Sequence, residues 1–469
     1  MTIKIALPKG KLLAETAILL AKAGWEMDGY NEGLRNYRVK SARFPDLMLK
    51  VFQEKDIPIQ VAIGNYDIGI CGLDWLEELT SKYPASAPIK IRDLGYGKGT
   101  LYLAASGDSA KMPSLTSLLS KSEIVRVASE YPNIAESFIL NLRIKRFNIY
   151  PVWGAAEAYP PESATLALVA GNTDEKLFNN GLKSLCKVLN FSACVIANRK
   201  SWGQKDLSDI LATLEKAKTE KSEIKMPEKV SAVKHFSIVA IDKDTVRIAL
   251  PDGHQQKHTV ELLNRAGIKL DDYPSPTGNR RPISNLEGVF IKVIRPQDMP
   301  LQVANCNFDL AITGRDWVTD HLNSFPSSPV QELADLKLGW VRIVAVVSKD
   351  VPADNIYDLQ GFYAQNTAPI RVASEYVNIA DKYARDNHLG MYRVIPTWGA
   401  TEAFLPEDAD LLIENTETGS TIARHNLKII DTLFESTARL VGAKNKEYSS
   451  IKKARIDRIV GLLSKTVSK

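Results

Sequence analysis

The chain has 469 residues, of which 45% are hydrophobic and 25% charged, and its formal net charge is +5. This composition is that of a globular protein, and the length predicts at least two domains because single cores rarely grow past about 250–300 residues. The small, evenly spread charge argues against nucleic acid as the main partner. No apolar run approaches the roughly 18 residues that a membrane span needs.

The cysteines and the N-terminus indicate the compartment. The four cysteines show no paired spacing, so neither a zinc site nor a disulfide framework is predicted. The first residues enter a strand-like run without the pattern of a secretory signal. We therefore expect a reducing, cytoplasmic location and no membrane partner.

The N-terminal region predicts a strand, a turn and an amphipathic helix, from IKIAL to KLLAETAILLAKAG. The stretch LPKGKLL places Lys9 and Lys11 at the strand-to-helix turn, where two cations suit a phosphate. A solvated helix start is the alternative. The basic stretch GLRNYRV contains Arg35 and Arg38, which either contact an anion or are simply solvated.

Short β-rich runs then alternate with helical periodicity along the chain. DIGICG, IVRVAS and FNIYPVW read as strands, and NIAESFILNL reads as a helix. Such alternation predicts an α/β fold with mostly parallel sheets.

The whole pattern occurs twice, which predicts an internal duplication. Four pairs of segments carry it in the same order: IKIALPKG and VRIALPDG, DIPIQVAIGNYDIGICGLDW and DMPLQVANCNFDLAITGRDW, VRVASEYPNIAESF and IRVASEYVNIADKY, and YPVWGAAEAYPPES and IPTWGATEAFLPED. We predict a first copy over 1–222, a charged linker over 223–244, and a second copy over 245–469.

In the second copy, RPQDMP and FDLAITG supply candidate binding residues. Arg295 precedes a predicted helix start, and its guanidinium can hold a diphosphate. Asp298 is interpreted as a residue that favours the helix N-terminus. Gly314 follows a buried strand, and loops at strand ends of parallel sheets bind ligands; a plain tight turn is the alternative.

The stretch LLIENTETGSTIARHNL, residues 411–427, predicts a phosphate-binding loop between a buried strand and a helix that begins near Ile422. A glycine lets the backbone approach a ligand, and hydroxyl groups with successive N–H groups can surround an anion. A Ser/Thr-rich turn with a helix cap is the alternative. The candidate residues are Asp410, Glu414, Glu417, Thr418, Gly419, Ser420 and Thr421.

These motifs together resemble the ATP phosphoribosyltransferase family, the first enzymes of histidine biosynthesis. The resemblance comprises LPKGKL, RxxD(I/M)P, D(I/L)(G/A)IxGxD, SEYPN and the D-x-x-x-(D/E)-x-x-x-T-G-x-T loop, and it covers both copies. It implies that each copy is a two-lobed fold like that of type II periplasmic binding proteins. The lobes would be about 1–95 plus 185–222 and 96–184, then about 245–338 plus 428–469 and 339–427.

The resemblance implies that ATP and phosphoribosyl pyrophosphate are joined with Mg²⁺, which binds through the substrate diphosphate, and that pyrophosphate is released. The loop would hold the 5-phosphate and ribose, and Arg295 would meet the diphosphate or triphosphate. Glu414 and Arg342 complete the implied catalytic set. A non-catalytic ligand-binding or regulatory protein of the same fold is the alternative function.

The two copies differ at the implied site. In the first copy Gln53 replaces Arg295 and Thr100 replaces Arg342, and its loop carries acids at Asp174 and Glu175, which would repel a phosphate. We therefore expect one working site, in the second copy.

Two departures and the family's assembly bear on this expectation. Asp252 and His254 stand in the second copy where Lys9 and Lys11 stand in the first. Members of the family work as dimers, so the fused copies would form an intrachain pseudo-dimer, with further oligomers possible and with Arg35 or Arg38 contributing in trans. Short members also work with a histidyl-tRNA-synthetase-like regulatory subunit, so the resemblance implies either that feedback is absent or that a separate subunit of this kind supplies it.

Overall fold

The computed structural model describes residues 2–34, 37–107, 123–171, 181–218, 242–276, 278–364, 367–444 and 446–468. Most of the predicted linker, residues 223–241, lies outside them. The chain divides into two compact units, each discontinuous in sequence. Unit 1 comprises Met1–Pro151, Ala164–Ala232 and Trp398–Ala403, and unit 2 comprises Val152–Ser163, Val233–Thr397 and Phe404–Lys469.

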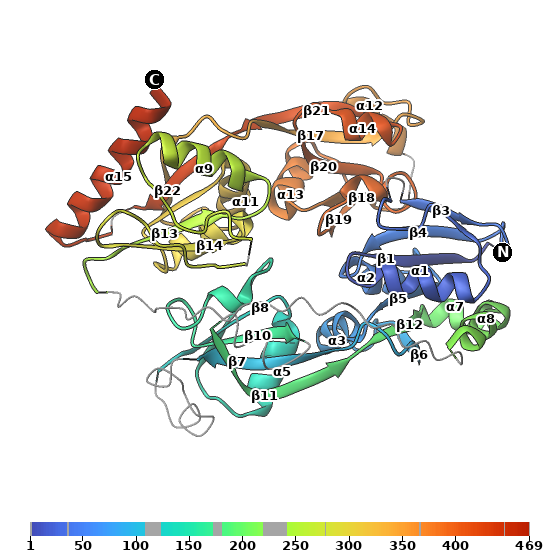
Figure 1. Ribbon diagram of the computed structural model, residues 1–469. Helices are drawn as coiled ribbons and strands as arrows, with labels where there is room; N and C mark the ends of the chain where they lie inside the picture. The colour runs from blue at the N-terminus through green and yellow to red at the C-terminus, as the bar shows by residue number, and fades with distance from the viewer. Residues whose placement is uncertain are drawn as a thin grey trace. The chain divides into compact units, whose positions relative to one another are not determined.

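The first sheet of unit 1 contains the N-terminal strand in its middle (Figure 1). Its strand order is β2-β3-β4-β1-β5-β12-β6, in which β1 is parallel to β4 and β5 whereas β12 is antiparallel to β5. The strands are β1 (Lys4–Lys9), β2 (Met27–Asp28), β3 (Arg38–Ser41), β4 (Met48–Gln53), β5 (Ile68–Gly72), β6 (Ile89–Asp93) and β12 (Ala193–Ala197). The helices are α1 (Leu13–Lys22), α2 (Asp56–Ala62), α3 (Leu73–Lys82), α7 (Arg199–Gln204) and α8 (Ser208–Lys218).

The second sheet of unit 1 has the order β11-β7-β10-β8-β9. Two long strands, β7 and β11, pair antiparallel, and β8 is parallel to β9 and β10. The elements are β7 (Gly99–Ser106), β8 (Val125–Ser129), α5 (Pro132–Asn141), β9 (Phe147–Pro151), β10 (Leu166–Gly171) and β11 (Leu182–Phe191).

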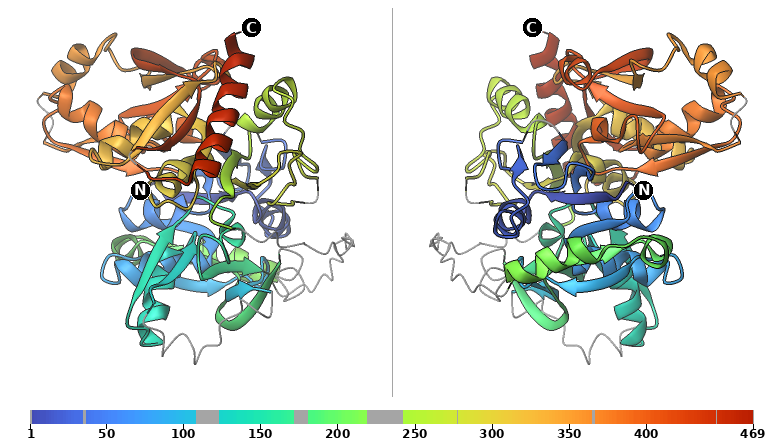
Figure 2. Two further views of the ribbon diagram at one scale, coloured as in Figure 1. Left: turned by 90° about the vertical axis from the view of Figure 1, so that its left-hand side faces the viewer. Right: turned by 90° about the vertical axis from the view of Figure 1, so that its right-hand side faces the viewer.

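The first sheet of unit 2 has the order β14-β13-β15-β22-β16, and the C-terminal helix α15 packs on it beside α9 (Figures 1 and 2). Strand β13 is parallel to β14 and β15, whereas β22 is antiparallel to β15. The elements are β13 (Val246–Pro251), α9 (Gln255–Arg265), β14 (Val289–Ile294), η2 (Pro296–Asp298), α10 (Met299–Ala304), β15 (Leu310–Gly314), α11 (Arg315–Ser324), β16 (Val330–Asp335), β22 (Ala438–Ala443) and α15 (Ser450–Ser468).

The second sheet of unit 2 has the order β19-β18-β20-β17-β21. The elements are β17 (Val341–Ser348), α12 (Ile356–Tyr363), β18 (Ile370–Ser374), α13 (Val377–Asp386), β19 (Tyr392–Pro396), β20 (Leu411–Thr416), α14 (Ser420–Arg424) and β21 (Leu427–Ser436). Two 3₁₀ helices, η1 (Ala156–Ala158) and η3 (Thr401–Phe404), lie in the repeated WGA segments.

The chain leaves the first sheet of unit 2 after β16, builds the second sheet, and returns to the first as β22. Unit 1 repeats this path with β6, β7 and β12. The predicted fold class, α/β with a two-lobed periplasmic-binding-protein-like arrangement in each copy, is confirmed. The helix expected near Ile422 is present but short: it begins at Ser420 and ends at Arg424. It ends there because Asn426 adopts φ +59° and β21, which follows, pairs with β17.

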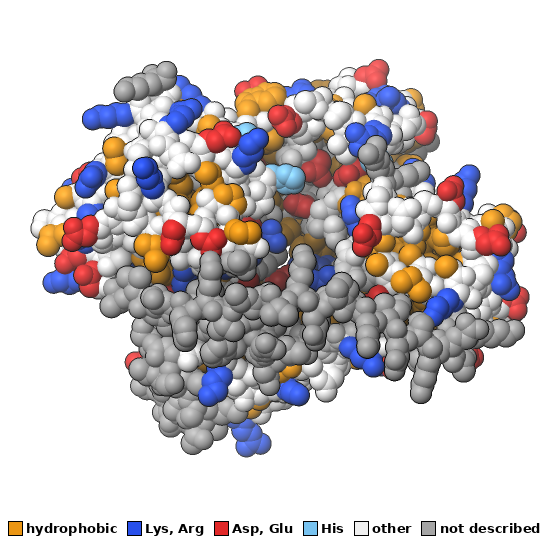
Figure 3. Space-filling view, in the orientation of Figure 1, with side chains coloured by type: hydrophobic (Ala, Val, Ile, Leu, Met, Phe, Trp, Pro, Cys, Tyr) orange, Lys and Arg blue, Asp and Glu red, His pale blue; other side chains and the backbone are white. Residues whose placement is uncertain are grey.

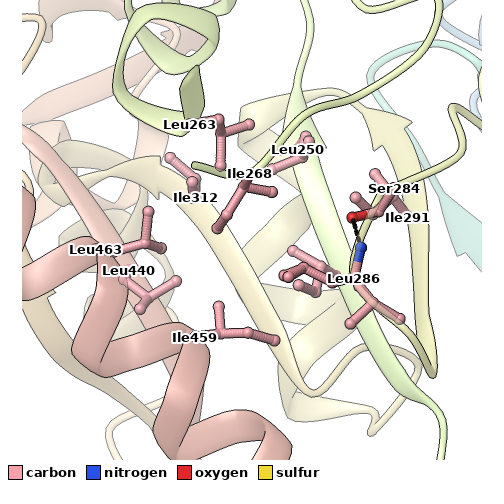
Figure 4. Close-up of a pocket in the computed structure, with 12 residues that line it drawn as sticks. Leu250, Leu263, Ile268, Ser284, Leu286, Ile291, Ile312, Leu440, Ile459 and Leu463 are labelled. Carbon is pink, nitrogen blue, oxygen red and sulfur yellow. Dashed lines mark hydrogen bonds between the residues drawn. The ribbon is translucent and has the colours of Figure 1, made fainter. Parts of the chain in front are cut away.

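Apolar side chains from one face of the unit 2 first sheet pack with side chains of α9 and α15 in a core. A cavity of about 10 Å³ remains among aliphatic side chains such as Leu250, Leu440 and Ile459 (Figure 4). The polar group drawn there, Ser284, accepts a hydrogen bond from Leu286 N at 3.0 Å. Because so small an apolar space has no room for a ligand, the cavity belongs to the core and not to a binding site.

The described residues show no helix that is both long and apolar enough to cross a membrane. On the face drawn in Figure 3, Lys and Arg side chains are interspersed with Asp and Glu side chains. This mixture agrees with the small net charge of the sequence.

A buried ion cluster holds the segment Val152–Ser163 in unit 2. The Lys292 side chain, on β14, is fully buried, and its Nζ lies 2.8 Å from Glu162 Oε2. Arg281 Nη2 lies 3.1 Å from the same oxygen and donates to Pro160 O at 2.6 Å. Burial lowers the pKa of Lys292 to about 7, with Arg281 adding to this and Glu162 opposing it. The segment therefore packs in unit 2 through a charge pair whose lysine is fully buried and whose glutamate is 8% exposed.

Replacing Glu162 by Gln is expected to destabilise unit 2 by about 3–5 kcal/mol, because it leaves Lys292 buried without an anion. The double variant E162L/K292M should recover most of this loss, since apolar side chains replace both charges. Urea unfolding combined with hydrogen exchange in β14 measures both effects. The control is D386N, which removes an exposed pair with Lys382 and should cost less than about 0.5 kcal/mol. A loss in E162Q no larger than that of the control would contradict the assignment.

Candidate functional site

The first part of the candidate site lies where three parallel strands of unit 2 end. Asp252 follows β13, Arg295 follows β14, and Gly314 is the last residue of β15. Since β13 pairs in parallel with both neighbours, these residues share one edge of the sheet. An alanine at Gly314 would bring its Cβ within 1.9 Å of Asp316 Oδ1, so the Asp316 carboxylate would have to move.

The Arg295 side chain forms an ion pair with Asp252. Its Nη1 lies 3.2 Å from Asp252 Oδ1, and its Nε is buried without a hydrogen-bond partner among the described residues. The side chain is 41% exposed. Arg280 Nη1 lies 2.7 Å from the other oxygen of Asp252. Asp252, an acid in a position expected to bind phosphate, is thus paired with two arginines.

The segment Val152–Ser163 reaches this edge from the first copy. Asp298 accepts hydrogen bonds from Trp153 N at 3.1 and 3.2 Å and from Tyr159 Oη at 3.3 Å. The interpretation of Asp298 as a helix-start residue is confirmed in position, since Asp298 directly precedes α10, but no side-chain cap hydrogen bond is formed and its carboxylate binds this segment instead. The Trp153 ring packs 5.6 Å from that of Trp317, as a core side chain would.

The second part of the candidate site is the loop after β20. Gly419 has φ +77° and is the N-cap of α14, so it adopts the left-handed conformation that favours glycine. Gly419 N donates to Thr416 Oγ1 at 2.9 Å, and Ser420 N donates to Thr418 Oγ1 at 3.3 Å. Glu417, Thr418, Ser420 and Thr421 are exposed. The loop thus has the strand–glycine–helix form that the sequence predicts.

Arg342 and Glu414 lie beside this loop. In the antiparallel pair β17–β20, Arg342 faces Thr416 and Val344 faces Glu414. Side chains at directly opposed positions share one face of a sheet, so Arg342 and Glu414 are diagonal neighbours. Arg342 Nε is buried without a hydrogen-bond partner among the described residues. This is the second arginine of unit 2 with a buried, unpaired Nε at a predicted site position.

The structure does not bring Asp410 to the loop. Asp410 precedes β20, and six residues of strand, about 20 Å, separate it from Thr416. Its carboxylate accepts from Arg371 N at 2.8 Å and pairs with the Arg371 guanidinium at 3.0 Å. Asp410 therefore links the starts of β18 and β20. It lies far from the loop that is predicted to bind the ligand.

A hydrogen-bonded set that sequence analysis missed joins the two sheets of unit 2. Tyr376 Oη donates to Asp316 Oδ2 at 2.6 Å, Ser436 Oγ donates to Asp316 Oδ1 at 2.9 Å, and Asn415 Nδ2 donates to Tyr376 Oη at 3.0 Å. Burial raises the pKa of Asp316 despite these bonds. Asn415 immediately precedes Thr416, so the set connects the base of the loop to α11. The signal for it was the repeated GxDW and SEY motifs.

In unit 1, the predicted residues occupy the corresponding sheet edge. Lys9 Nζ donates to Tyr37 Oη at 3.1 Å, and Tyr37 Oη donates to Glu402 Oε1 at 3.4 Å. Lys11 is exposed after the β1 turn, and Arg38 is exposed at the start of β3. Arg35 lies outside the described residues, as do the loop positions of the first copy that carry Asn172 to Lys176.

Glu54 follows β4 in unit 1, at the position of Pro296 in the second copy, and its side chain reaches the N-terminus of α1. Leu12 N donates to Glu54 Oε1 at 3.0 Å. Burial raises the pKa of Glu54 to about 7, although the Leu12 N–H and Lys11 both favour the charged form. A carboxyl group of the protein therefore occupies a place where an incoming anion would meet the first turn of α1.

Among the described residues, no group of three or more His, Cys, Asp or Glu side chains could hold a metal ion. Glu414 and the exposed Glu417 are the carboxylates at the loop. This set fits Mg²⁺ that is carried by a substrate diphosphate, because Mg²⁺ is often held by one or two carboxylates and by phosphate oxygens.

These features define a two-lobed α/β protein with arginines at a strand edge and a glycine–hydroxyl loop. The sequence pattern of the family described as ATP phosphoribosyltransferase matches residues 53–216 and 295–465. The chain belongs to the ATP phosphoribosyltransferase family, and the predicted family and enzyme class are confirmed.

Similar proteins include the ATP phosphoribosyltransferases of Chlorobaculum parvum and Prosthecochloris aestuarii. The first is 30% identical over 230 residues, which are 48% of this chain and 72% of that protein. The second is 31% identical over 235 residues, with the same two shares of 48% and 72%.

Similar solved structures include the ATP phosphoribosyl transferase HisG:HisZ complex from Thermotoga maritima. Its TM-score is 0.39 at 18% identity, and the match covers 48% of this chain and 99% of that chain. The periplasmic aliphatic sulphonate binding protein SsuA from Escherichia coli matches with a TM-score of 0.30 at 12% identity, covering 46% of this chain and 72% of that chain.

The raised pKa of Glu54 predicts how the stability of unit 1 depends on pH. Between its ordinary value of 4.5 and about 7, the folded state binds more protons than the unfolded state, so this group's contribution is lost as the pH rises. The free energy of unfolding of E54Q should therefore exceed that of the native chain by up to about 3 kcal/mol above pH 7 and by little at pH 4.5. Thermal unfolding at both pH values measures this, with D46N as an exposed control. A pH-independent difference would contradict it.

Proposed function

We propose that the chain joins N1 of the ATP adenine to C1 of phosphoribosyl pyrophosphate, releasing pyrophosphate, as the first step of histidine biosynthesis. The C1–oxygen bond to the diphosphate breaks, and the diphosphate takes the electron pair. Family membership supports the reaction, and the Thr416–Thr421 loop beside Arg342 and Glu414 is the observation that carries it.

The chemistry needs positioning and charge neutralisation more than a nucleophilic side chain. In this proposal the loop N–H groups and hydroxyls hold the 5-phosphate, and Glu414 and Glu417 accept from the ribose hydroxyls. Arg295 and Arg342, each with an unpaired Nε, bind the leaving diphosphate or the triphosphate of ATP. Mg²⁺ bound to the diphosphate would add positive charge there, next to Glu414 or Glu417.

We propose that this site works in the second copy alone of a tandem duplication, with copies at 1–222 and 245–469. Gln53 and Thr100 replace the two arginines in the first copy, and the Glu54 side chain reaches the N-terminus of α1. Lys9, Lys11, Arg35 and Arg38 stay predicted substrate contacts, and the intrachain pseudo-dimer stays part of the proposal.

A cytoplasmic location and a histidyl-tRNA-synthetase-like regulatory subunit complete the proposal. The location agrees with four cysteines that are all free. The subunit rests on the resemblance of the sequence to short members of the family, so activity is to be measured with and without it.

The test is formation of phosphoribosyl-ATP, followed by its ultraviolet absorbance, from ATP, phosphoribosyl pyrophosphate and Mg²⁺. G419A should lower kcat/KM by about 10–100-fold, because a Cβ disfavours φ +77° and shifts the loop N–H groups. The control is G390A, since Gly390 has φ +68° and open space around it away from the loop. Equal kinetics in the two variants would exclude the loop as a substrate-binding element. If the native chain forms no product, the alternative function of a ligand-binding protein is favoured.

A further inference from the structure

Four charged side chains form a continuous series at the strand edge of unit 2. Arg280 Nε lies 3.7 Å from Glu157 Oε1, and Arg280 Nη1 lies 2.7 Å from Asp252 Oδ2. Asp252 Oδ1 lies 3.2 Å from Arg295 Nη1. The order of charges is thus acid, base, acid, base, and the series ends at Arg295. The Asp252 side chain is only 11% exposed, so it meets the two guanidinium groups more than it meets water.

The first-copy segment also contacts Arg295 directly. A Cβ built on Gly154 would lie 2.9 Å from Arg295 Nε and 3.6 Å from its Cγ and Nη2. The guanidinium therefore rests on the Gly154 backbone on one side while Asp252 holds its Nη1. These two contacts restrict a long side chain that would otherwise sample many rotamers.

Equivalent positions of unit 1 form a shorter series with different charges. Lys9 is equivalent to Asp252, Tyr37 to Arg280 and Glu402 to Glu157. Lys9 Nζ donates to Tyr37 Oη at 3.1 Å, and Tyr37 Oη donates to Glu402 Oε1 at 3.4 Å. Gln53 stands for Arg295. In unit 1 a lysine supplies the positive charge, whereas in unit 2 an aspartate replaces it and organises two arginines.

We propose that Asp252 and Glu157 are positioning residues that set the Arg295 guanidinium to receive a diphosphate group. This rests on the proposed function, because it deepens the role of Arg295 there. Asp252 holds Arg295 directly, and Glu157 acts through Arg280, which would otherwise draw the Asp252 carboxylate away. In this proposal, the acid that replaces a phosphate-binding lysine positions an arginine. The replacement therefore does not mean that the site has lost its contact with phosphate.

The experiment measures kcat, the KM of both substrates, and the Kd of inorganic pyrophosphate with Mg²⁺ in the full-length chain. D252N and E157Q should each raise the pyrophosphate Kd and the KM of one substrate by about tenfold. The reason is that a displaced guanidinium group no longer presents its N–H donors to the diphosphate in a fixed orientation. D252E should restore much of the loss, since it keeps the carboxylate. E402Q, the matched change in unit 1, should leave these values unchanged. Circular dichroism and thermal unfolding verify that each variant is folded.

A double-mutant cycle separates positioning from a general structural role. In an R295K chain, where the fork is absent, D252N should have little further effect on pyrophosphate binding. Additive effects of D252N and R295K, or an E157Q chain that behaves like E402Q, would overturn the inference.

The binding measurement also separates this inference from the proposed function. If the native chain forms no phosphoribosyl-ATP, with or without a regulatory subunit, the proposed reaction fails. Pyrophosphate binding that D252N and E157Q weaken only while Arg295 is present would still sustain the positioning role. No binding of pyrophosphate by the native chain would overturn it.

Discussion

A lysine with no exposed surface determines how the C-terminal unit is assembled. Lys292 points from β14 into the packed interior, where an isolated ammonium group would be costly. Burial would raise the pKa of Glu162, but Lys292 and Arg281 outweigh it and hold that pKa below its ordinary value. The segment that contains Glu162 must therefore stay in unit 2, although it comes from the first copy.

The placement of this segment has consequences at the strand edge. Once Glu162 is fixed, Trp153 N reaches Asp298, Gly154 supports Arg295, and Glu157 faces Arg280. Each contact joins a backbone or side chain of Val152–Ser163 to a residue at the carboxyl ends of parallel strands.

Within unit 2 the two sheets are linked by a buried carboxyl group. Asp316 receives hydrogen bonds from Tyr376 and Ser436, and Tyr376 in turn receives one from Asn415. In unit 1 the Asp74–Tyr131 bond of 2.7 Å is kept, whereas Phe191 occupies the place of Ser436, and Asp74 Oδ1 has no partner among the described residues. The copies thus share their apolar framework and differ in the polar groups around it.

The sequence alone determined the elements and the local shape of the loop. Alternating periodicity predicted the strands and helices, the repeat predicted two similar sets of sheets, and the stretch 411–427 predicted a strand, a loop that contains Gly419 and a helix. These features depend on neighbours within a few residues, so local propensity specifies them. The early end of α14 was not predicted, because pairing of β21 with β17 overrides local helical preference.

Only the tertiary structure decided which distant groups meet. The sequence placed Asp410 near the loop, but Arg371 binds it at the far end of β20. It also left Asp252 as an unexplained acid, whereas Arg280 and Arg295 neutralise it. The partner of a charge is set by chain folding over more than a hundred residues, as for Glu162 and Lys292, and the spacing of residues along a sequence carries no record of that choice.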